Sequence, residues 1–233
     1  MTVETDAADV VNEDVPSPGS MDEATPIPNP SFPPSPILTL PKCHIRPYHP
    51  TDAAPIAHHA NNHLISKWMT NIFPHPYTLS DGISWINLNL SLSPAQNFVI
   101  VDPTTSLAIG GIGLKPGTDV HERSVEVGYW LGEEYWGRGI ATEALVGFVG
   151  WVFGAREWER VIRVHAWVYE GNAASGRVLW KAGFRFEGSL RKHVWKEGRL
   201  LDLEIYAVLR EEWEGRERER AAEKRPCAEE VSI

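Results

Sequence analysis

The eight residues Tyr135-Trp136-Gly137-Arg138-Gly139-Ile140-Ala141-Thr142 are the most informative stretch of this 233-residue chain. They follow a segment that alternates between polar and apolar residues, and they precede a long apolar segment. Glycine lets backbone amides approach a ligand closely, and the first amides of a helix bind anions with help from the helix dipole. The stretch therefore predicts a strand-to-helix turn that binds a pyrophosphate through backbone donors, with Arg138 adding charge. A purely structural turn is the alternative.

Neither of two common nucleotide-binding patterns fits this turn. The Walker pattern requires Gly-Lys-Ser/Thr after an earlier glycine, and no such run is present. The Rossmann pattern requires a third glycine where Thr142 stands, and the turn lies late in the chain, after an antiparallel-looking meander.

The segments around the turn predict a mixed sheet with helices on its faces. Period-two alternation indicates a strand over residues 123–131, in which Val125, Val127 and Tyr129 share one face. Helices are expected over residues 53–62, after a Thr51-Asp52 cap, and over 139–153 and 173–182, with another opened by Ser80-Asp81. Further strands are expected over residues 37–40, 44–46, 96–102, 107–114, 160–168, 184–195 and 199–209.

The net charge of −9 is concentrated at the two ends of the chain. Residues 1–41 hold seven acidic residues and no Lys or Arg, and residues 1–36 hold eight prolines. We expect residues 1–36 to be a disordered tail, with a Pro-rich docking ligand as the alternative. Residues 42–210 hold 16 acidic and 17 basic residues, so the domain expected over 37–213 is nearly neutral. Residues 214–233 are expected to be a charged tail, and charges over 211–224 suit an exposed helix.

The composition also excludes several classes of protein. No run of 18 apolar residues predicts a membrane span, and a secretory signal is not expected, because no cationic segment followed by an apolar stretch is present. Cys43 and Cys227 cannot form a disulfide framework or by themselves a zinc site. No basic stripe suggests nucleic-acid binding. A cytoplasmic location is expected, with the nucleus as the alternative.

At the central turn the sequence resembles the GNAT superfamily of acyl-CoA-dependent N-acyltransferases. The family signature is Gln/Arg-x-x-Gly-x-Gly/Ala, and residues 136–141 match it except that Trp136 takes the first place. In having Trp at this place, the chain resembles the branch of the family that includes the ribosomal-protein N-terminal acetyltransferases. The same branch is supported by Ile45-Arg46-Pro47-Tyr48, Ile109-Gly110-Gly111-Ile112-Gly113-Leu114, Glu126-Val127-Gly128-Tyr129-Trp130-Leu131, Gly171-Asn172-Ala173-Ala174-Ser175, Lys181-Ala182-Gly183-Phe184 and Tyr206-Ala207-Val208-Leu209.

The resemblance implies acetyl-CoA as donor, a primary amine as acceptor and no metal. It implies a mostly antiparallel, seven-stranded α/β (α+β) sheet splayed between two parallel central strands, 123–131 and 160–168, with helices on both faces. The backbone of Trp130 and Leu131 would pair with the pantetheine arm as an added strand does. The pyrophosphate would lie on the turn, whose cofactor-binding residues are Trp136, Gly137, Arg138, Gly139, Ile140, Ala141 and Thr142.

The resemblance also implies catalytic residues. Glu126 matches the acid that many members use as base, and partial burial would raise its pKa; a solvated or ion-paired Glu is the alternative. Asn172 matches the Asn that contacts the pantetheine arm, although a plain helix cap also explains it. By the same resemblance Ser175, one turn later, would bind the cofactor and donate to the leaving thiolate. The usual Tyr acid is replaced by Leu179, so either Ser175 or water would take that role, or the thiolate would leave with little help from an acid.

The acceptor side is less defined by the sequence. The resemblance places residues 61–77 around the acceptor pocket, so Trp68, Tyr77 and Glu126 are candidate substrate contacts. His58, His59 and His63 have ligand-like spacing, with His59 and His63 at i and i+4 of a helix, but exposed or substrate-lining histidines are preferred to a metal site.

Two functions stay open at this level. The first is an acetyl-CoA-dependent N-acetyltransferase acting on a protein α-amine, a polyamine, an amino sugar or an amino-acid-like metabolite. The second, motivated by Leu179 and the acidic tail, is a non-catalytic acyl-CoA-binding or regulatory module. Membrane and nucleic-acid partners are not expected, and the chain is expected to be a monomer or a homodimer.

Overall fold

The computed structural model describes residues 31–223, so most of the expected N-terminal tail and the last ten residues lie outside the described part. The strands are β1 (Leu38–Thr39), β2 (His44–Pro47), β3 (Asn97–Val101), β4 (Ala108–Pro116), β5 (Ser124–Leu131), β6 (Arg163–Tyr169), β7 (Arg185–Lys196) and β8 (Arg199–Leu209). The α-helices are α1 (Ala53–Ala60), α2 (His63–Ser66), α3 (Leu79–Leu90), α4 (Ile140–Gly154), α5 (Ala173–Lys181) and α6 (Arg210–Glu223).

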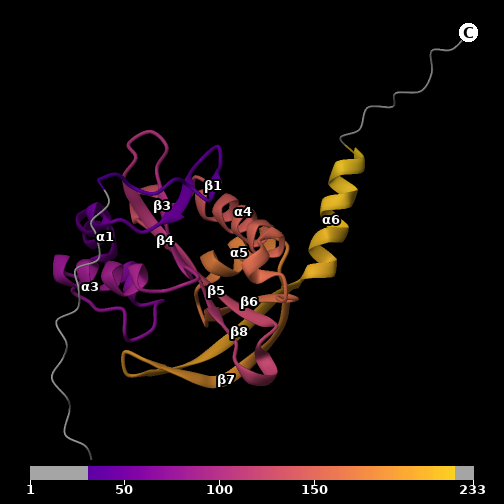
Figure 1. Cartoon of the computed structure of the whole chain (residues 1–233). Helices are drawn as coiled ribbons and strands as arrows, with labels where there is room; N and C mark the ends of the chain where they lie inside the picture. Colours follow the sequence, from indigo (N-terminus) through magenta and orange to yellow (C-terminus); the bar gives the residue numbers. More distant parts are fainter. Residues whose placement is uncertain (1–30, 224–233) are drawn as a thin grey trace, which may run out of the picture.

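The eight strands form one sheet in the order β1-β2-β3-β4-β5-β6-β8-β7 (Figure 1). The predicted α/β class and mixed sheet are confirmed. The eight strands expected from the residue pattern are all present, whereas the count of seven implied by the resemblance is one short. The two-residue β1 lies within the strand expected over 37–40 and pairs antiparallel with β2. Every pair is antiparallel except β5 and β6.

The parallel pair β5 and β6 separates part-way along its length. The two strands are paired only from Ser124 to Glu126, where Glu126 lies opposite His165. On its other side β5 stays paired with β4 as far as Leu131, and β6 stays paired with β8 as far as Tyr169. The sheet therefore splays beyond Glu126, as expected for residues 123–131 and 160–168.

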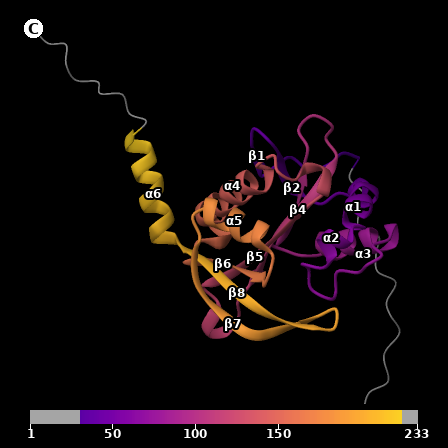
Figure 2. The ribbon, with the colours of Figure 1, turned by 180° about the vertical axis from the view of Figure 1, so that it is seen from behind.

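Alternating residues on the strands pack into separate cores on the two faces of the sheet. On β3, Phe98 and Ile100 pack against α4 and α5, whereas Val99 and Val101 pack against α1 and α3. This alternation follows from the two-residue repeat of a strand. Helices thus cover both faces, as Figures 1 and 2 show.

The first helices differ in detail from the sequence prediction. The expected helix over 53–62 ends at Ala60, and a separate short helix begins at His63. Asp52 is the N-cap residue of α1, within the expected Thr51-Asp52 cap, but its side chain makes no capping bond to that helix. Its carboxylate instead forms two 2.7 Å bonds with the buried Arg46 guanidinium and accepts the His49 backbone N–H at 2.8 Å. His49 caps the preceding 3-10 turn.

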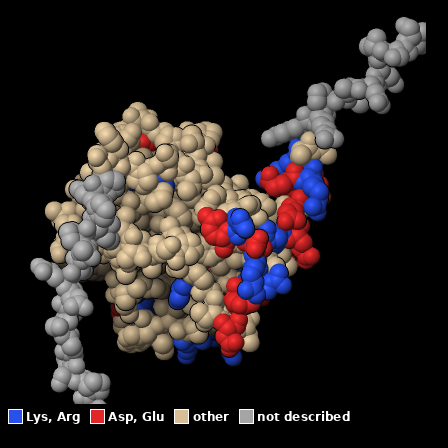
Figure 3. Space-filling model, in the orientation of Figure 1, with Lys and Arg blue, Asp and Glu red and all other residues tan. Residues whose placement is uncertain are grey.

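Helix α6 confirms the exposed helix expected from the charge alternation near the C-terminus. Its first turns dock on the domain through Trp213, which is buried, and through Arg216, which donates to the Gly183 carbonyl at 2.8 Å. Charged side chains gather along this helix in Figure 3, while much of the remaining face in that view is uncharged. Within residues 31–223, no helix combines the length and apolar character that crossing a membrane requires.

Candidate functional site

The opening between β5 and β6 leads into a cleft of about 1580 Å³. Its walls come from the turn before α4, the splayed part of β5, the start of α5, strand β6 and the segment around α2. The cleft is lined by all but one of the predicted site residues: Trp68, Tyr77, Glu126, Trp130, Leu131, Trp136, Gly137, Gly139, Ile140, Ala141, Thr142, Asn172 and Ser175. Arg138 is the exception, since its guanidinium lies over the Tyr135 ring, 5.4 Å from the centroid.

Two glycines set the backbone conformation of the turn before α4. Gly137 and Gly139 have φ values of +74° and +77°, a region that L side chains rarely adopt. Gly139 is the N-cap of α4, and no side chain caps the helix there. Lys42 adds positive charge beside the turn, because its ammonium donates to the Arg138 carbonyl at 3.1 Å. Free amides at the start of a helix and a nearby cation fit a phosphate group. Lys42 was not predicted as part of this site from the sequence.

Trp136 is held beside the splayed strand. Its indole N–H donates to the Leu131 carbonyl at 2.7 Å. That carbonyl belongs to the part of β5 that, by the resemblance, would pair with the pantetheine arm of the cofactor. The bond joins the end of β5 to the turn, and it was not evident from the sequence.

Glu126 stands where β5 and β6 part. Its side chain is 26% exposed, and the Lys115 ammonium on β4 lies 4.0 Å from one carboxylate oxygen. Burial raises the pKa of Glu126 above the ordinary carboxyl value, and the charge of Lys115 opposes this rise. A carboxylate with a raised pKa, open to a cleft, is suited to accept a proton.

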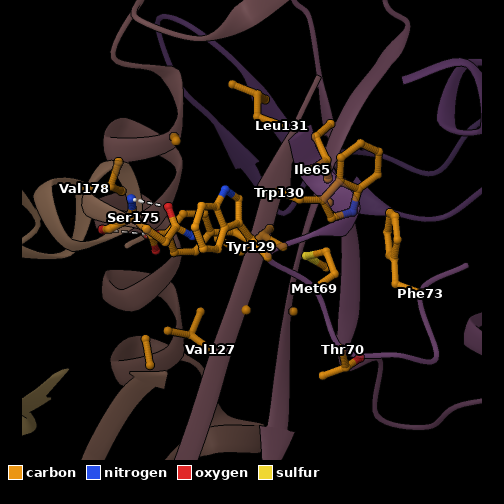
Figure 4. Close-up of a pocket in the computed structure, with 18 of the residues that line it drawn as sticks. Ile65, Met69, Thr70, Phe73, Val127, Tyr129, Trp130, Leu131, Ser175 and Val178 are labelled. Carbon is orange, nitrogen blue, oxygen red and sulfur yellow. Dashed lines mark hydrogen bonds between the residues drawn. The ribbon is translucent and has the colours of Figure 1, made fainter. Parts of the chain in front are cut away.

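Ser175 on α5 forms a hydroxyl pair with Tyr129 on β5. The two hydroxyl oxygens are 3.0 Å apart, and the Ser175 carbonyl oxygen, at 3.3 Å, is an alternative acceptor for the single Tyr129 hydroxyl proton. Burial raises the pKa of Tyr129. Figure 4 shows Tyr129 pointing toward α5, while Trp130 points to the other side, toward Phe73. The sequence did not reveal this pair, because it forms across the splay between distant segments.

Asn172 is a helix cap, as its alternative interpretation proposed. Its side-chain oxygen accepts the Ser175 backbone N–H at 3.2 Å. Leu179, at the place of the usual Tyr, is fully buried in the core. The cleft-facing residues of α5 include Ser175 and Val178. The Leu179 side chain is therefore part of the hydrophobic core in this chain.

The acceptor side of the cleft is largely aromatic. Phe73 packs at 5.1 Å from Tyr77 and 6.0 Å from Trp130, measured between ring centroids. Tyr77 is buried, and burial raises its pKa to about 12. Trp167 and His193, from β6 and β7, also line this side. Neither was found from the sequence, since they come from strands far from residues 61–77.

The histidines do not form the helical pair expected from their spacing. His63 begins a new helix and lies 3.8 Å from Glu197, whereas His59 packs on Tyr135 at 5.5 Å. His58, His59 and Glu134 have ligand atoms within 4.8 Å of one another. Two of these three residues are exposed, and no second feature points to an ion.

Comparison with known proteins assigns the domain to a family. Residues 42–185 match the model described as the acetyltransferase (GNAT) domain. The chain belongs to the GNAT family. This GNAT protein is 31% identical over 167 residues to the uncharacterized N-acetyltransferase p20 of Bacillus licheniformis, which covers 70% of this chain and 90% of p20. It is also 36% identical over 97 residues to the putative ribosomal N-acetyltransferase YdaF of Bacillus subtilis, or 42% of this chain and 51% of YdaF.

Solved structures agree with this assignment. Mycobacterium smegmatis RimJ, in complex with CoA-disulfide, has a TM-score of 0.63 at 27% identity, over 73% of this chain and 83% of RimJ. The ribosomal-protein-S5-alanine acetyltransferase of Vibrio fischeri has a TM-score of 0.64 at 24% identity, over 76% of this chain and 97% of that protein, and shows the fold alone. The GNAT chain is thus an acyltransferase.

Proposed function

We propose that this GNAT protein transfers an acetyl group from acetyl-CoA to a primary amine, with Glu126 as general base. The observation that carries the proposal is the position of Glu126. Its partly buried carboxylate lies where β5 and β6 separate, in the same cleft as the glycine turn and the Ser175 hydroxyl.

The donor end of the cleft suits acetyl-CoA. Backbone amides of residues 137–142 would hold the pyrophosphate at the start of α4, beside the Lys42 ammonium. Bound there, acetyl-CoA supplies an activated thioester. Both glycines matter, because their positive φ values aim the backbone of the turn.

Glu126 serves the attacking amine. A primary amine is mostly protonated at neutral pH, and only its neutral form has a lone pair for attack. Because burial raises the pKa of Glu126, its carboxylate takes a proton more readily than an exposed Glu does. It can accept the proton directly or through one water.

Ser175 serves the leaving thiolate. Its hydroxyl accepts from Tyr129 in one arrangement of the pair and is then free to donate its own proton into the cleft. Tyr129 is thus a positioning residue, and Asn172 fixes the start of α5 beneath Ser175.

The acceptor we favour is the α-amine of a peptide or protein. The name of one similar protein supports this choice, since it is a putative ribosomal N-acetyltransferase. The cleft, at about 1580 Å³, also exceeds the roughly 300–1,000 Å³ of usual small-molecule sites, which leaves room for donor and acceptor together.

Thiol release from acetyl-CoA, measured with a panel of peptides, polyamines, amino sugars and amino acids, tests the proposal. We expect release with peptides that have a free N-terminus, and mass spectrometry should find the acetyl group on the α-amine. Matched peptides blocked at the N-terminus should be inert. Acetyl-CoA binding with no thiol release from any amine would contradict the proposal and favour a non-catalytic acyl-CoA-binding module.

A further inference from the structure

A second, smaller cavity of about 160 Å³ lies at the tip of the β7–β8 hairpin. Figures 1 and 2 show this hairpin extending beneath α2 and α3, and His63 of α2 lies 3.8 Å from Glu197 at the tip. Three basic residues line the cavity, Lys67, Lys196 and Arg199, together with two acidic residues, Glu170 and Glu197.

Lys196 is the unusual member of this group. The residue is only 8% exposed. It lies directly opposite Arg199 across the two-residue turn of the hairpin. Like charges in that position repel each other. Within residues 31–223, neither the Lys196 ammonium nor the Arg199 guanidinium has a hydrogen-bond or ion-pair partner.

The acidic residues of the cavity have other partners. Glu197 is paired with His63, and Glu170 accepts the Asp202 backbone N–H at 3.2 Å. Lys67 lies over the Trp68 ring, 5.0 Å from the centroid. Lys196 and the exposed Arg199 therefore bring positive charge to the cavity without forming an ion pair, and the two acidic residues offset only part of the charge of the three basic ones.

The cavity adjoins the main cleft. Lys67 and Trp68 line both spaces. The strands also run from one space to the other: Tyr169, Val194 and Leu203 line the cleft, while Glu170, Lys196 and Leu201 line the cavity. An acceptor whose amine lies at Glu126 can thus extend past Trp68 to Lys196.

We propose that Lys196 and Arg199, with Lys67, form a carboxylate subsite that selects acceptors with an acidic group. This inference rests on the proposed function, because Glu126 marks the place of the amine. A single carboxylate fits better than a phosphate, since three basic and two acidic residues leave one net positive charge in a cavity of about 160 Å³. A charge-assisted hydrogen bond to Lys196 would supply the missing partner.

The test compares peptides that differ in one residue, Glu or Gln, placed in turn at positions one to four from a free N-terminus. Free glutamate and glutamine form a second arm. In the wild type we expect kcat/KM for the best Glu peptide to exceed that of its Gln partner about tenfold, which is the effect of one charge-assisted contact. Lys196→Gln should reduce this ratio to about one to two, and Arg199→Gln, at an exposed residue, should reduce it in part.

Arg191→Gln is the matched control, because Arg191 is an exposed cation on the same strand and lines neither space. It should keep the wild-type ratio. A preference seen only for free glutamate also supports the subsite and identifies the acceptor as an amino acid. Equal rates for every Glu and Gln pair would overturn the subsite and leave the proposed function intact.

A binding measurement separates the two proposals further. Titration calorimetry of each peptide pair into the protein with free CoA needs no turnover. Tighter binding of the Glu peptide, lost in Lys196→Gln, supports the subsite even where no amine is acetylated. Equal binding and no turnover would reject both proposals.

Discussion

The two ends of the cleft are built in different ways. The donor end consists mostly of consecutive residues, 136–142, in one turn whose conformation depends on Gly137 and Gly139. The acceptor end combines the segment around α2 with β5, β6 and the β7–β8 hairpin, which are far apart in the sequence. A local motif can thus determine cofactor binding, whereas acceptor choice depends on how distant segments pack. Changes at one end should leave the affinity of the other end nearly unaffected.

The largest effect is expected at Glu126. Glu126→Gln keeps the shape of the side chain but removes the base, so kcat should fall by about 10²- to 10⁴-fold. Steady-state thiol release with a peptide acceptor measures this. Glu126→Asp, which keeps a carboxylate, should retain more activity than Glu126→Gln. Equal kcat values for wild type and Glu126→Gln would remove Glu126 from the mechanism.

The next effect is expected at Gly137. A Cβ there meets no atom within 4 Å, so any harm in Gly137→Ala comes from its positive φ, which costs about 1–2 kcal/mol in an L residue. The turn should lose its conformation, and KM for acetyl-CoA should rise about tenfold. Gly154→Ala is the control: this residue of α4 also has open space but no positive φ. A similar change in KM for acetyl-CoA in both variants would contradict the role of this turn in binding the cofactor.

A smaller effect is expected at the Tyr129–Ser175 pair. Ser175→Ala should lower kcat about tenfold, less than the loss of a typical general acid, because a thiolate leaves readily. Tyr129→Phe should lower it less, since it removes only the partner of the hydroxyl. In a double-mutant cycle, Tyr129→Phe should have little further effect once Ser175 is Ala. Additive losses would show that the two hydroxyls act separately.

The smallest effect concerns pH. Lys115 lowers the pKa of Glu126, so Lys115→Met should raise that pKa further. The acidic limb of the kcat/KM profile should then move to higher pH, by up to about 0.7 unit for an exposed pair of this kind. Lys115→Arg keeps the charge and should keep the wild-type limb. A limb that moves to lower pH would show that Lys115 does not stabilise the Glu126 carboxylate.

Local sequence signals predicted the fold well. The alternation over 123–131, the glycine turn and the cap at Asn172 all depend on neighbouring residues, and the structure has each of them. The helix expected over 53–62 ran two residues past the end of α1, and the short helix α2 was not predicted, although Asn62 caps it. The side-chain role of Asp52 was misread because its partner Arg46 lies in a strand.

The site was predicted less completely, for a physical reason. Tyr129 meets Ser175 across the splay, and Lys42 reaches the turn from the start of the chain. Lys196 lies at a hairpin tip that extends to α2. These contacts depend on the direction of whole elements, which single residues and their spacing do not specify.

The most direct test of the separation between the two ends is titration calorimetry of acetyl-CoA with the wild type, Glu126→Gln and Gly137→Ala. We predict that Glu126→Gln binds acetyl-CoA with the wild-type Kd, although it has lost most of its turnover. Gly137→Ala should bind about tenfold more weakly. If Glu126→Gln weakened acetyl-CoA binding as much as Gly137→Ala does, the two ends of the cleft would not be separate.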